Sequence, residues 1–223
     1  AAIIQHNTSV FASKKEANIS NISDFEGKRY AGWGSPIEET TLKALMTDAD
    51  ADYKKIAQKT IGTSDFFSTI GRESDIQWIF YGWDGIEAKR RGIDLNYIWL
   101  KDLNPALDYY TPVIVTTERN ITQKPEIVKK FMKAVHDGYE YAINNPNNAA
   151  SILIHSAPEL NDQLVQNSQL WLSKEYKAEA QQWGVQKKEV WSRYSKWLFK
   201  NNLIEKDIDV DKAFTNKFLP LSK

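Results

Sequence analysis

The chain of 223 residues contains no cysteine. This absence excludes disulfide bonds, thiolate catalysis and metal sites that use cysteine ligands. The sequence also lacks an excess of one charge, because 29 lysines and arginines balance 29 aspartates and glutamates. Without a basic surplus it does not have the electrostatic signature of a nucleic-acid-binding protein. No apolar run approaches the length of a membrane-spanning helix.

Several motifs for cofactors and catalysis are missing as well. The histidines His6, His136 and His155 do not have the spacing of metal ligands. The pair Gly32-x-Gly34 lacks the third glycine of a dinucleotide-binding fingerprint, and there is no nucleophile elbow or phosphate-binding loop. We therefore expect neither a cofactor nor a metal ion.

The first half of the sequence has the pattern of an α/β unit. Short apolar segments that are typical of strands alternate with helical spacing. The expected strands are residues 3–12, 29–31, 54–62, 75–80 and 95–100. The expected helices begin at Pro36, after an N-cap at Ser64, and at Asp84. This alternation predicts a mainly parallel sheet.

The second half is predicted to be helical. Residues 109–118 read as one more strand. From Pro125 to Phe218 the apolar residues recur with helical spacing, and Pro125 and Pro146 stand where helices are expected to begin. We place a boundary between the two patterns at residues 117–122.

One unusual strand-to-helix junction reads GWGSPIEE, residues 32–39, and is called the first junction below. Its glycines permit a sharp turn and a close approach of another group. Ser35 and the free amides of the following helix can bind an anion or a polar group, and Trp33 adds a flat ring. Trp33, Gly34 and Ser35 are therefore candidate ligand-binding residues. The alternative is an ordinary tight turn in which Ser35 is the N-cap and Trp33 is half buried.

The second junction, residues 78–92, reads WIFYGWDGIEAKRRG and combines aromatic rings with an acid. Ligands of parallel α/β sheets bind beyond the carboxyl ends of strands, where Tyr81 and Trp83 are expected. Glu87 follows one helical turn after Trp83 and is the candidate acceptor for an exocyclic amine. The alternative is an aromatic core with a surface glutamate, for which Gly82 and Gly85 are poor choices.

Polar residues in two further segments are weaker candidates. His6 and Asn7 interrupt an apolar strand, and a frayed, solvated terminus explains them equally well. The segment from Asp108 to Pro112, with Tyr109 as its candidate, could line a cleft where the chain crosses between lobes. A strand edge with exposed tyrosines is the alternative.

Taken in order, five motifs carry a family resemblance: GWGSPIEE, WIFYGWDGIEA, DYYTPVIVT, WGVQKKEVW and AFTNKFLP. With them the chain resembles the thiamine-pyrimidine-precursor binding proteins of bacterial ABC importers, whose superfamily includes alkanesulfonate receptors and fungal pyrimidine synthases. The resemblance implies an α/β, two-lobed periplasmic-binding-protein fold of type II. Residues 12–108 would form a complete second lobe. Residues 1–11 and 109–223 would form the hinge crossings and the helical remainder of a truncated first lobe.

The resemblance also implies ligand, partners and location. The ligand would be an aminopyrimidine such as formylaminopyrimidine, with Tyr81 and Trp83 against its ring and Glu87 on its amine. Trp33, Gly34 and Ser35 would close on it. The protein partner would be a membrane permease, and the location extracytoplasmic, with the secretion signal in a segment that precedes this sequence. An uncovered face of the first lobe would favour self-association.

Two other functions stay open at this point. One is an enzyme similar to the fungal synthases, which use a histidine, a lysine that carries pyridoxal phosphate, and a cysteine-rich motif. The absence of cysteine argues against it. The other is a receptor for an alkanesulfonate or a similar anion held at the start of the helix after Ser35. Glu87 argues against an anion because the two charges would repel each other.

Overall fold

The computed structural model describes residues 1–62 and 64–220, and they divide into two compact units. The α/β unit contains Thr8–Leu107 and Ser195–Asp207. The helical unit contains Ala1–Asn7, Asp108–Tyr194 and the segment from Ile208. The expected division at 12 and 108 into a second lobe and the remainder of a first lobe stays a prediction. It did not anticipate that Ser195–Asp207 joins the α/β unit, and the last three residues of the expected segment 109–223 lie outside the described residues.

The described part of the α/β unit forms a five-stranded mixed sheet in the order β3-β2-β4-β1-β5. Its strands are β1 (Ser9–Lys14), β2 (Arg29–Gly32), β3 (Ala57–Thr60), β4 (Ile76–Phe80) and β5 (Leu95–Trp99). β2 is parallel to both β3 and β4, whereas β1 runs antiparallel to β4 and β5. Each expected strand has an observed counterpart, but the first begins at Ser9 and not at residue 3, so that expected start is wrong. β1 is the one strand of the described sheet that runs against the others.

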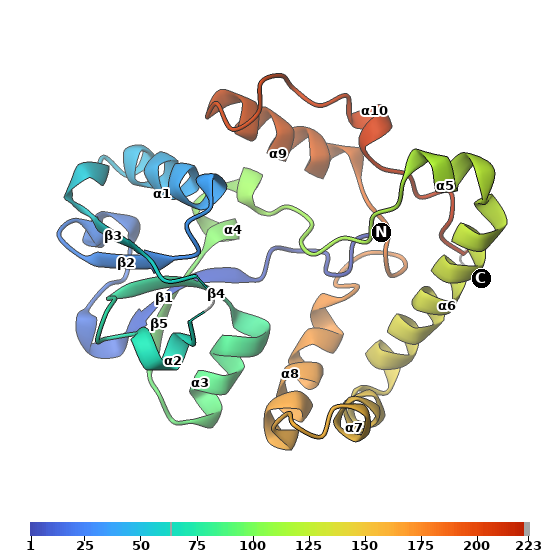
Figure 1. Ribbon diagram of the computed structural model, residues 1–223, viewed down its shortest axis with the longest axis horizontal. Helices are drawn as coiled ribbons and strands as arrows, with labels where there is room; N and C mark the ends of the chain where they lie inside the picture. The colour runs from blue at the N-terminus through green and yellow to red at the C-terminus, as the bar shows by residue number, and fades with distance from the viewer. Residues whose placement is uncertain (63, 221–223) are drawn as a thin grey trace. The chain divides into compact units, whose positions relative to one another are not determined.

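The two faces of this sheet carry different side chains, because successive residues of a strand point to opposite sides. Phe11, Tyr30 and Trp78 lie on one face, where the ring of Phe11 is 6.1 Å from Tyr30 and 5.6 Å from Trp78. Val10 and Ile79 belong to a cluster on the other face. In Figure 1, α1 covers one side of the sheet, and α2 and α3 lie on the other.

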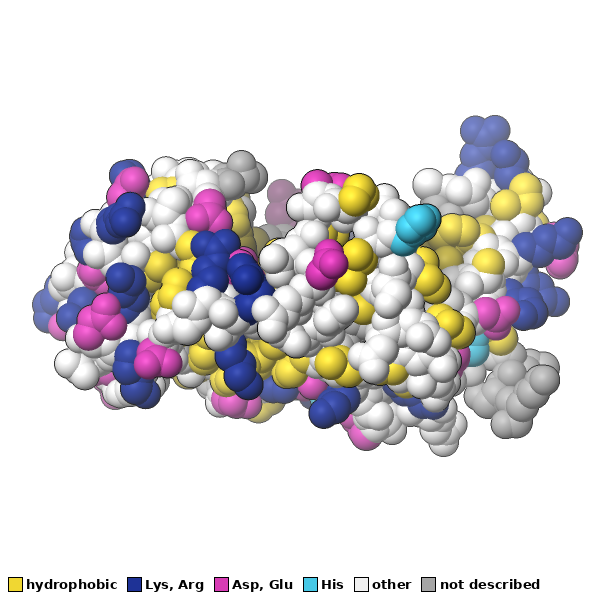
Figure 2. Space-filling model, turned by 90° about the horizontal axis from the view of Figure 1, so that it is seen from below, with side chains coloured by type: hydrophobic (Ala, Val, Ile, Leu, Met, Phe, Trp, Pro, Cys, Tyr) yellow, Lys and Arg dark blue, Asp and Glu magenta, His cyan; other side chains and the backbone are white. Residues whose placement is uncertain are grey.

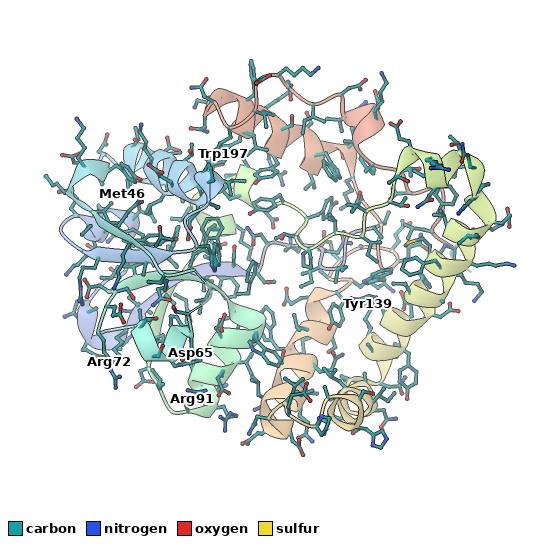
Figure 3. All side chains as sticks on the ribbon, in the orientation of Figure 1. Met46, Asp65, Arg72, Arg91, Tyr139 and Trp197 are labelled. Carbon is teal, nitrogen blue, oxygen red and sulfur yellow. The ribbon has the colours of Figure 1, made fainter. Side chains whose placement is uncertain are left out.

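The helices of the α/β unit begin close to the expected positions. They are α1 (Pro36–Asp48), α2 (Phe66–Thr69), α3 (Ile86–Arg90) and α4 (Leu100–Leu103), with short 3-10 turns at Lys15–Ala17, Ile22–Phe25, Tyr53–Lys55 and Pro105–Leu107. Pro36 is the first residue of α1, as predicted. The expected N-cap at Ser64 is wrong, because the carboxylate of Asp65 accepts the amide of Ser68 at 2.8 Å and caps α2 (Figure 3).

The helical unit contains two helices, α6 and α7, that start at the predicted prolines, and further helices that start elsewhere. They are α5 (Glu118–Gln123), α6 (Pro125–Asn144), α7 (Pro146–Ser156), α8 (Asp162–Glu175), α9 (Lys188–Lys200) and α10 (Val210–Ala213), and α9 continues into the α/β unit from Ser195. Trp183 is fully buried and stacks on Tyr139 of α6 at 4.2 Å. Tyr139 is labelled in Figure 3.

The strand expected at residues 109–118 is wrong. The described structure has no strand in this segment, although Val113 forms one isolated bridge with Ala2. The amide of Ile3 donates to the carbonyl of Pro112 at 3.0 Å, and Ile114 and Ala1 exchange hydrogen bonds of 2.8 and 3.1 Å. β-Branched residues favour a strand only where a neighbouring edge is free to pair with them.

The surface and the helices agree with the composition. Figure 2 shows lysine and arginine interspersed with aspartate and glutamate on the face that it draws, with apolar side chains between them. Among the described residues, no helix combines the length and the apolar character that crossing a membrane requires. No cluster of three or more histidine, aspartate or glutamate side chains with the arrangement of a metal site occurs in the same residues.

Candidate ligand-binding site

The two junctions that the sequence singled out lie at one edge of the sheet. β2 and β4 are parallel neighbours, so their carboxyl ends meet there, which is where α/β sheets bind ligands. Trp33 follows β2, and its ring stacks on Phe80 at the end of β4, with centroids 6.4 Å apart and planes at 21°. The ring centroids of Trp33 and Trp78 are 5.8 Å apart. The exposed fractions of Trp33 and Phe80 are 44% and 43%, so both rings are open to a flat ligand.

The backbone of the first junction is fixed by capping. The side chain of Ser35 accepts the amide of Glu38 at 3.3 Å and is the N-cap of α1. Gly34 has a φ of +83°, and a Cβ at this position would collide with the side chain of Thr60. The alternative of a capped turn therefore accounts for Ser35 and Gly34, and their contacts with a ligand stay predictions.

The second junction turns at once from strand to helix. Tyr81–Gly85 forms one wide π-helical turn that leads into α3, so the helix begins before the expected Asp84. Trp83 lies in this turn and is 39% exposed. It is thus placed, like Trp33, to offer an open ring after a strand end.

Tyr81 has a different position from the one expected for a ligand-stacking ring. Its ring packs against Tyr97 and Trp99, each with centroids 5.1 Å away. A Cβ on Gly85 would come within 3.0 Å of three atoms of this ring. Gly85 therefore has a packing reason, contrary to the expectation from the sequence. The ring of Tyr81 is shared with the core, and its contact with a ligand stays a prediction.

Glu87 is buried and engaged by two arginines. Its carboxylate accepts Nε and Nη2 of Arg90 at 2.6 and 2.8 Å and Nε of Arg91 at 2.6 Å, and its side chain is 7% exposed. The hydrogen bonds from Arg90 and then Arg91 lower the pKa of Glu87 to about 2, although burial opposes the shift. The alternative of a surface glutamate is wrong. The contact of Glu87 with a ring amine stays a prediction. Its carboxylate is already paired with Arg90 and Arg91.

Glu38 is a buried acid at the first junction that the sequence analysis did not single out. It is 3% exposed, and its carboxylate accepts the hydroxyl of Tyr30 at 2.6 Å and the amide of Gly34 at 3.0 Å. An acid in the first turn of a helix is ordinary, because it favours the positive end of the helix dipole. The signal that could have pointed to Glu38 is Gly32, whose missing side chain leaves the space that the carboxylate occupies.

The weaker candidates lie in the helical unit, and both alternatives for them are wrong. Asn7 is fully buried, so the terminus is not frayed. The backbone amide of Asn7 donates to the carboxylate of Asp108 at 3.0 Å. Tyr109 stacks on Tyr194 with centroids 4.0 Å apart, and burial raises its pKa. Neither residue lies on a strand edge. Their roles in binding stay predictions.

His6 is held between two carboxylates of the helical unit. Its Nδ1 lies 2.7 Å from Asp108, and its Nε2 lies 2.9 Å from Glu179. The hydrogen bond with Asp108, supported by Glu179, raises the pKa of His6 to about 9 against the effect of partial burial. His6 is therefore charged at neutral pH and ties its neighbours together as an ion pair rather than as a metal ligand.

Comparison with known families identifies the chain. The family model described as "NMT1/THI5 like" matches residues 1–149. The chain belongs to this family. This finding confirms the relationship that the five motifs predicted, and the rest of the comparisons agree with it.

Two curated relatives match nearly the whole chain. The formylaminopyrimidine-binding protein of Halalkalibacterium halodurans is 24% identical over 90% of this chain and 62% of its own length. The riboflavin-binding protein RibY of Chloroflexus aurantiacus is 24% identical over 94% of this chain and 61% of its own length. The chain thus spans less than two thirds of each of these relatives.

A solved structure supports the fold class. The periplasmic aliphatic sulphonate binding protein SsuA of Escherichia coli matches all of this chain and 71% of its own with a TM-score of 0.68. At 13% identity this likeness shows the fold alone. The α/β fold of the periplasmic-binding-protein type, predicted from the resemblance, is confirmed.

Proposed function

We propose that this chain is the ligand-binding part of an extracytoplasmic substrate-binding protein that delivers a thiamine pyrimidine precursor to an ABC importer. The ligand is an aminopyrimidine such as formylaminopyrimidine, and the permease in the membrane is the protein partner. The role is binding without catalysis. The relative named for formylaminopyrimidine, similar over 90% of this chain, supports this ligand class.

The observation that carries the proposal is the group of open rings at the carboxyl ends of β2 and β4. Trp33 is stacked on Phe80, and Trp83 lies in the turn that follows. Each of the three is at least 39% exposed, although large rings are usually withdrawn from water. Offset stacking on a flat heterocycle would contribute about 0.5–1.5 kcal/mol per ring beyond the burial of area.

The same edge of the sheet disfavours a sulfonate as ligand. Anions bind at a helix start through free backbone amides. At the start of α1 the amide of Gly34 is already taken by Glu38, the amide of Glu38 donates to Ser35, and Pro36 has no N–H. A sulfonate would therefore find fewer free donors here than at an ordinary helix start, with a carboxylate close to them.

Calorimetric titration with formylaminopyrimidine, hydroxymethylpyrimidine, riboflavin and taurine tests the ligand class. We expect heat of binding from the two pyrimidines and none from taurine. Trp33→Ala should weaken pyrimidine binding, whereas Phe131→Ala, which removes a 55% exposed ring on α6, should leave it unchanged. Binding of riboflavin alone would reassign the ligand to an isoalloxazine. A folded, monomeric chain that binds none of the ring compounds would contradict the proposal.

Self-association through the helical unit stays a prediction, and its exposed apolar residues support it. Ile127 and Phe131 of α6 are 63% and 55% exposed, and Ile152 of α7 is 58% exposed. Light scattering after size-exclusion chromatography should detect a dimer or larger species at high concentration. Phe131→Glu should return the chain to a monomer if this face is the contact.

A further inference from the structure

Glu38 is a buried acid that forms no ion pair with a cation of the described residues, and it hydrogen-bonds to the backbone of the first junction. The ion pairs of the described residues do not include it, whereas Glu87 at the second junction has two arginine partners. Buried charges are normally paired, so an acid with only hydrogen-bonding partners is unusual. Its two partners, Tyr30 and Gly34, are both neutral.

The surroundings of Glu38 are built to hold a carboxylate. A Cβ on Gly32 would come within 3.0 Å of both carboxylate oxygens, so β2 ends in a residue that leaves room for them. The hydroxyl of Tyr30 donates to one oxygen and the amide of Gly34 to the other. Burial, followed by the negative charge of Glu38, raises the pKa of Tyr30 well above its usual value, which keeps this hydroxyl a donor.

The carboxylate of Glu38 accepts a backbone amide just before α1 that an anion could otherwise accept. A helix start attracts negative charge through the helix dipole and its free amides. Here the amide of Gly34 donates to the carboxylate of Glu38, so the acid at this amide comes from the chain itself. Gly34 directly follows Trp33, whose ring is exposed. This buried acid is thus bonded to the residue that directly follows Trp33, whose ring stacks on Phe80 in the candidate site.

We propose that Glu38 is the specificity-determining residue of the ring site: its carboxylate fills the anion position at the start of α1, so the site rejects anionic ligands and favours neutral or cationic rings that carry amine donors. This inference rests on the proposed function for its site and extends it to selectivity.

The test compares Glu38→Gln with the wild-type chain by calorimetric titration with formylaminopyrimidine and with taurine. Gln keeps the size of the side chain, and its amide can still serve both Tyr30 and Gly34. We expect the variant to bind formylaminopyrimidine at least tenfold more weakly and to gain measurable binding of taurine. Glu39→Gln, the same change at the exposed neighbouring acid, should behave as wild type and controls for net charge.

A second variant keeps the test decisive if Glu38→Gln does not fold. Tyr30→Phe with Glu38→Ala removes both partners of the buried hydrogen bond, which costs less than leaving one unpaired. This double variant frees the amide of Gly34 for an oxyanion, so taurine binding should appear in it as well. Circular dichroism confirms folding before either titration.

The outcomes separate the inference from the proposed function. If the wild type binds no pyrimidine but Glu38→Gln gains taurine binding, the proposed function fails and anion exclusion by Glu38 stands. If the wild type binds formylaminopyrimidine and both Glu38 variants bind it equally well while still rejecting taurine, the inference is overturned and the proposed function stands. Equal gains of taurine binding in Glu39→Gln would also overturn it, because net charge alone would then explain the effect.

Discussion

The two strand-to-helix junctions of the α/β unit look alike in the sequence and differ in their electrostatics. Each places open rings after a strand end and a buried glutamate in or near the first turn of the next helix. Glu87 of the second junction is held by Arg90 and Arg91. Glu38 of the first junction is held by Tyr30 and Gly34, which carry no charge. Among the described residues, Glu38 therefore has no cationic partner, whereas Glu87 has two.

This difference separates two uses of a buried acid. At the second junction Glu87 pairs with Arg90 and Arg91 at the end of the same helix, and these charge-assisted hydrogen bonds stabilise α3. At the first junction the acid replaces an external anion at the start of α1. Burial and position in the chain do not distinguish the two cases. The partners of each carboxylate do.

The largest effects are expected when the glycines of the junctions are replaced. Gly32→Ala would press a methyl group against the carboxylate of Glu38, and Gly85→Ala would press one against the ring of Tyr81. Overpacking of this kind should lower the free energy of unfolding by about 2–3 kcal/mol in each variant, as measured by urea denaturation. Gly138→Ala, in α6 with nothing within 4 Å, is the matched control and should stabilise by up to about 1 kcal/mol.

The two glycine variants should differ in binding. Gly32→Ala displaces the acid of the ring site, so the folded fraction should also bind formylaminopyrimidine more weakly. Gly85→Ala disturbs the packing of the Tyr81 ring and should lower affinity less than Gly32→Ala does. Equal losses of affinity in both variants would show that the two junctions act alike in binding. That result would contradict the difference in role proposed for Glu38 and Glu87.

An intermediate effect is expected at Glu87, through its lowered pKa. Its folded pKa of about 2 lies below the ordinary 4.5, so its contribution is present above about pH 4.5 and is lost as the pH falls toward 2. Glu87→Gln should cost about 1–2 kcal/mol at pH 7, less than the roughly 3 kcal/mol of the unscreened shift, because the side chain of Arg91 is 43% exposed and water screens its charge. Urea denaturation should show the difference from wild type shrinking at pH 3.

The control for Glu87 is Glu73→Gln, which removes the partner of Lys59 in an exposed ion pair. Such pairs contribute little, so the stability of this variant should stay close to that of the wild type. If Glu87→Gln instead keeps its stability and loses affinity for formylaminopyrimidine, the ligand role predicted from the sequence is correct, and Glu87 is not the structural acid of the comparison.

Much of the α/β unit could be predicted from the sequence, and the reasons are local. Strands such as β4 have short apolar runs between turn residues, and α1 has a proline after a capping serine. The segment 109–118 failed because its β-branched residues do not show whether an edge is free to pair with them. The cap at Ser64 failed because the next residue, Asp65, is an equally good cap.

The candidate site was predictable in its rings but not in its charges. Trp33 and Trp83 stand out because they follow strand ends beside glycines. The pairing of Glu87 was signalled by arginines three and four residues later, which lie on the same helix face. The role of Glu38 was not signalled in the same way, because it depends on Tyr30 in a strand and on the space left by Gly32. Such contacts arise only when the strand and the helix pack together.

The smallest effects are expected at the rings, and a double-mutant cycle makes them informative. Trp33→Ala and Trp83→Ala should each weaken formylaminopyrimidine binding by about 0.5–1.5 kcal/mol, the range for one stacked ring pair. If one ligand ring contacts both side chains, the double variant should lose less than the sum, with a coupling of at least about 0.5 kcal/mol. A cycle of Trp33 with Phe131, in the helical unit, should be additive. Additivity between Trp33 and Trp83 would mean that the junctions hold different parts of the ligand, and the charge of Glu38 would then act on only one of them.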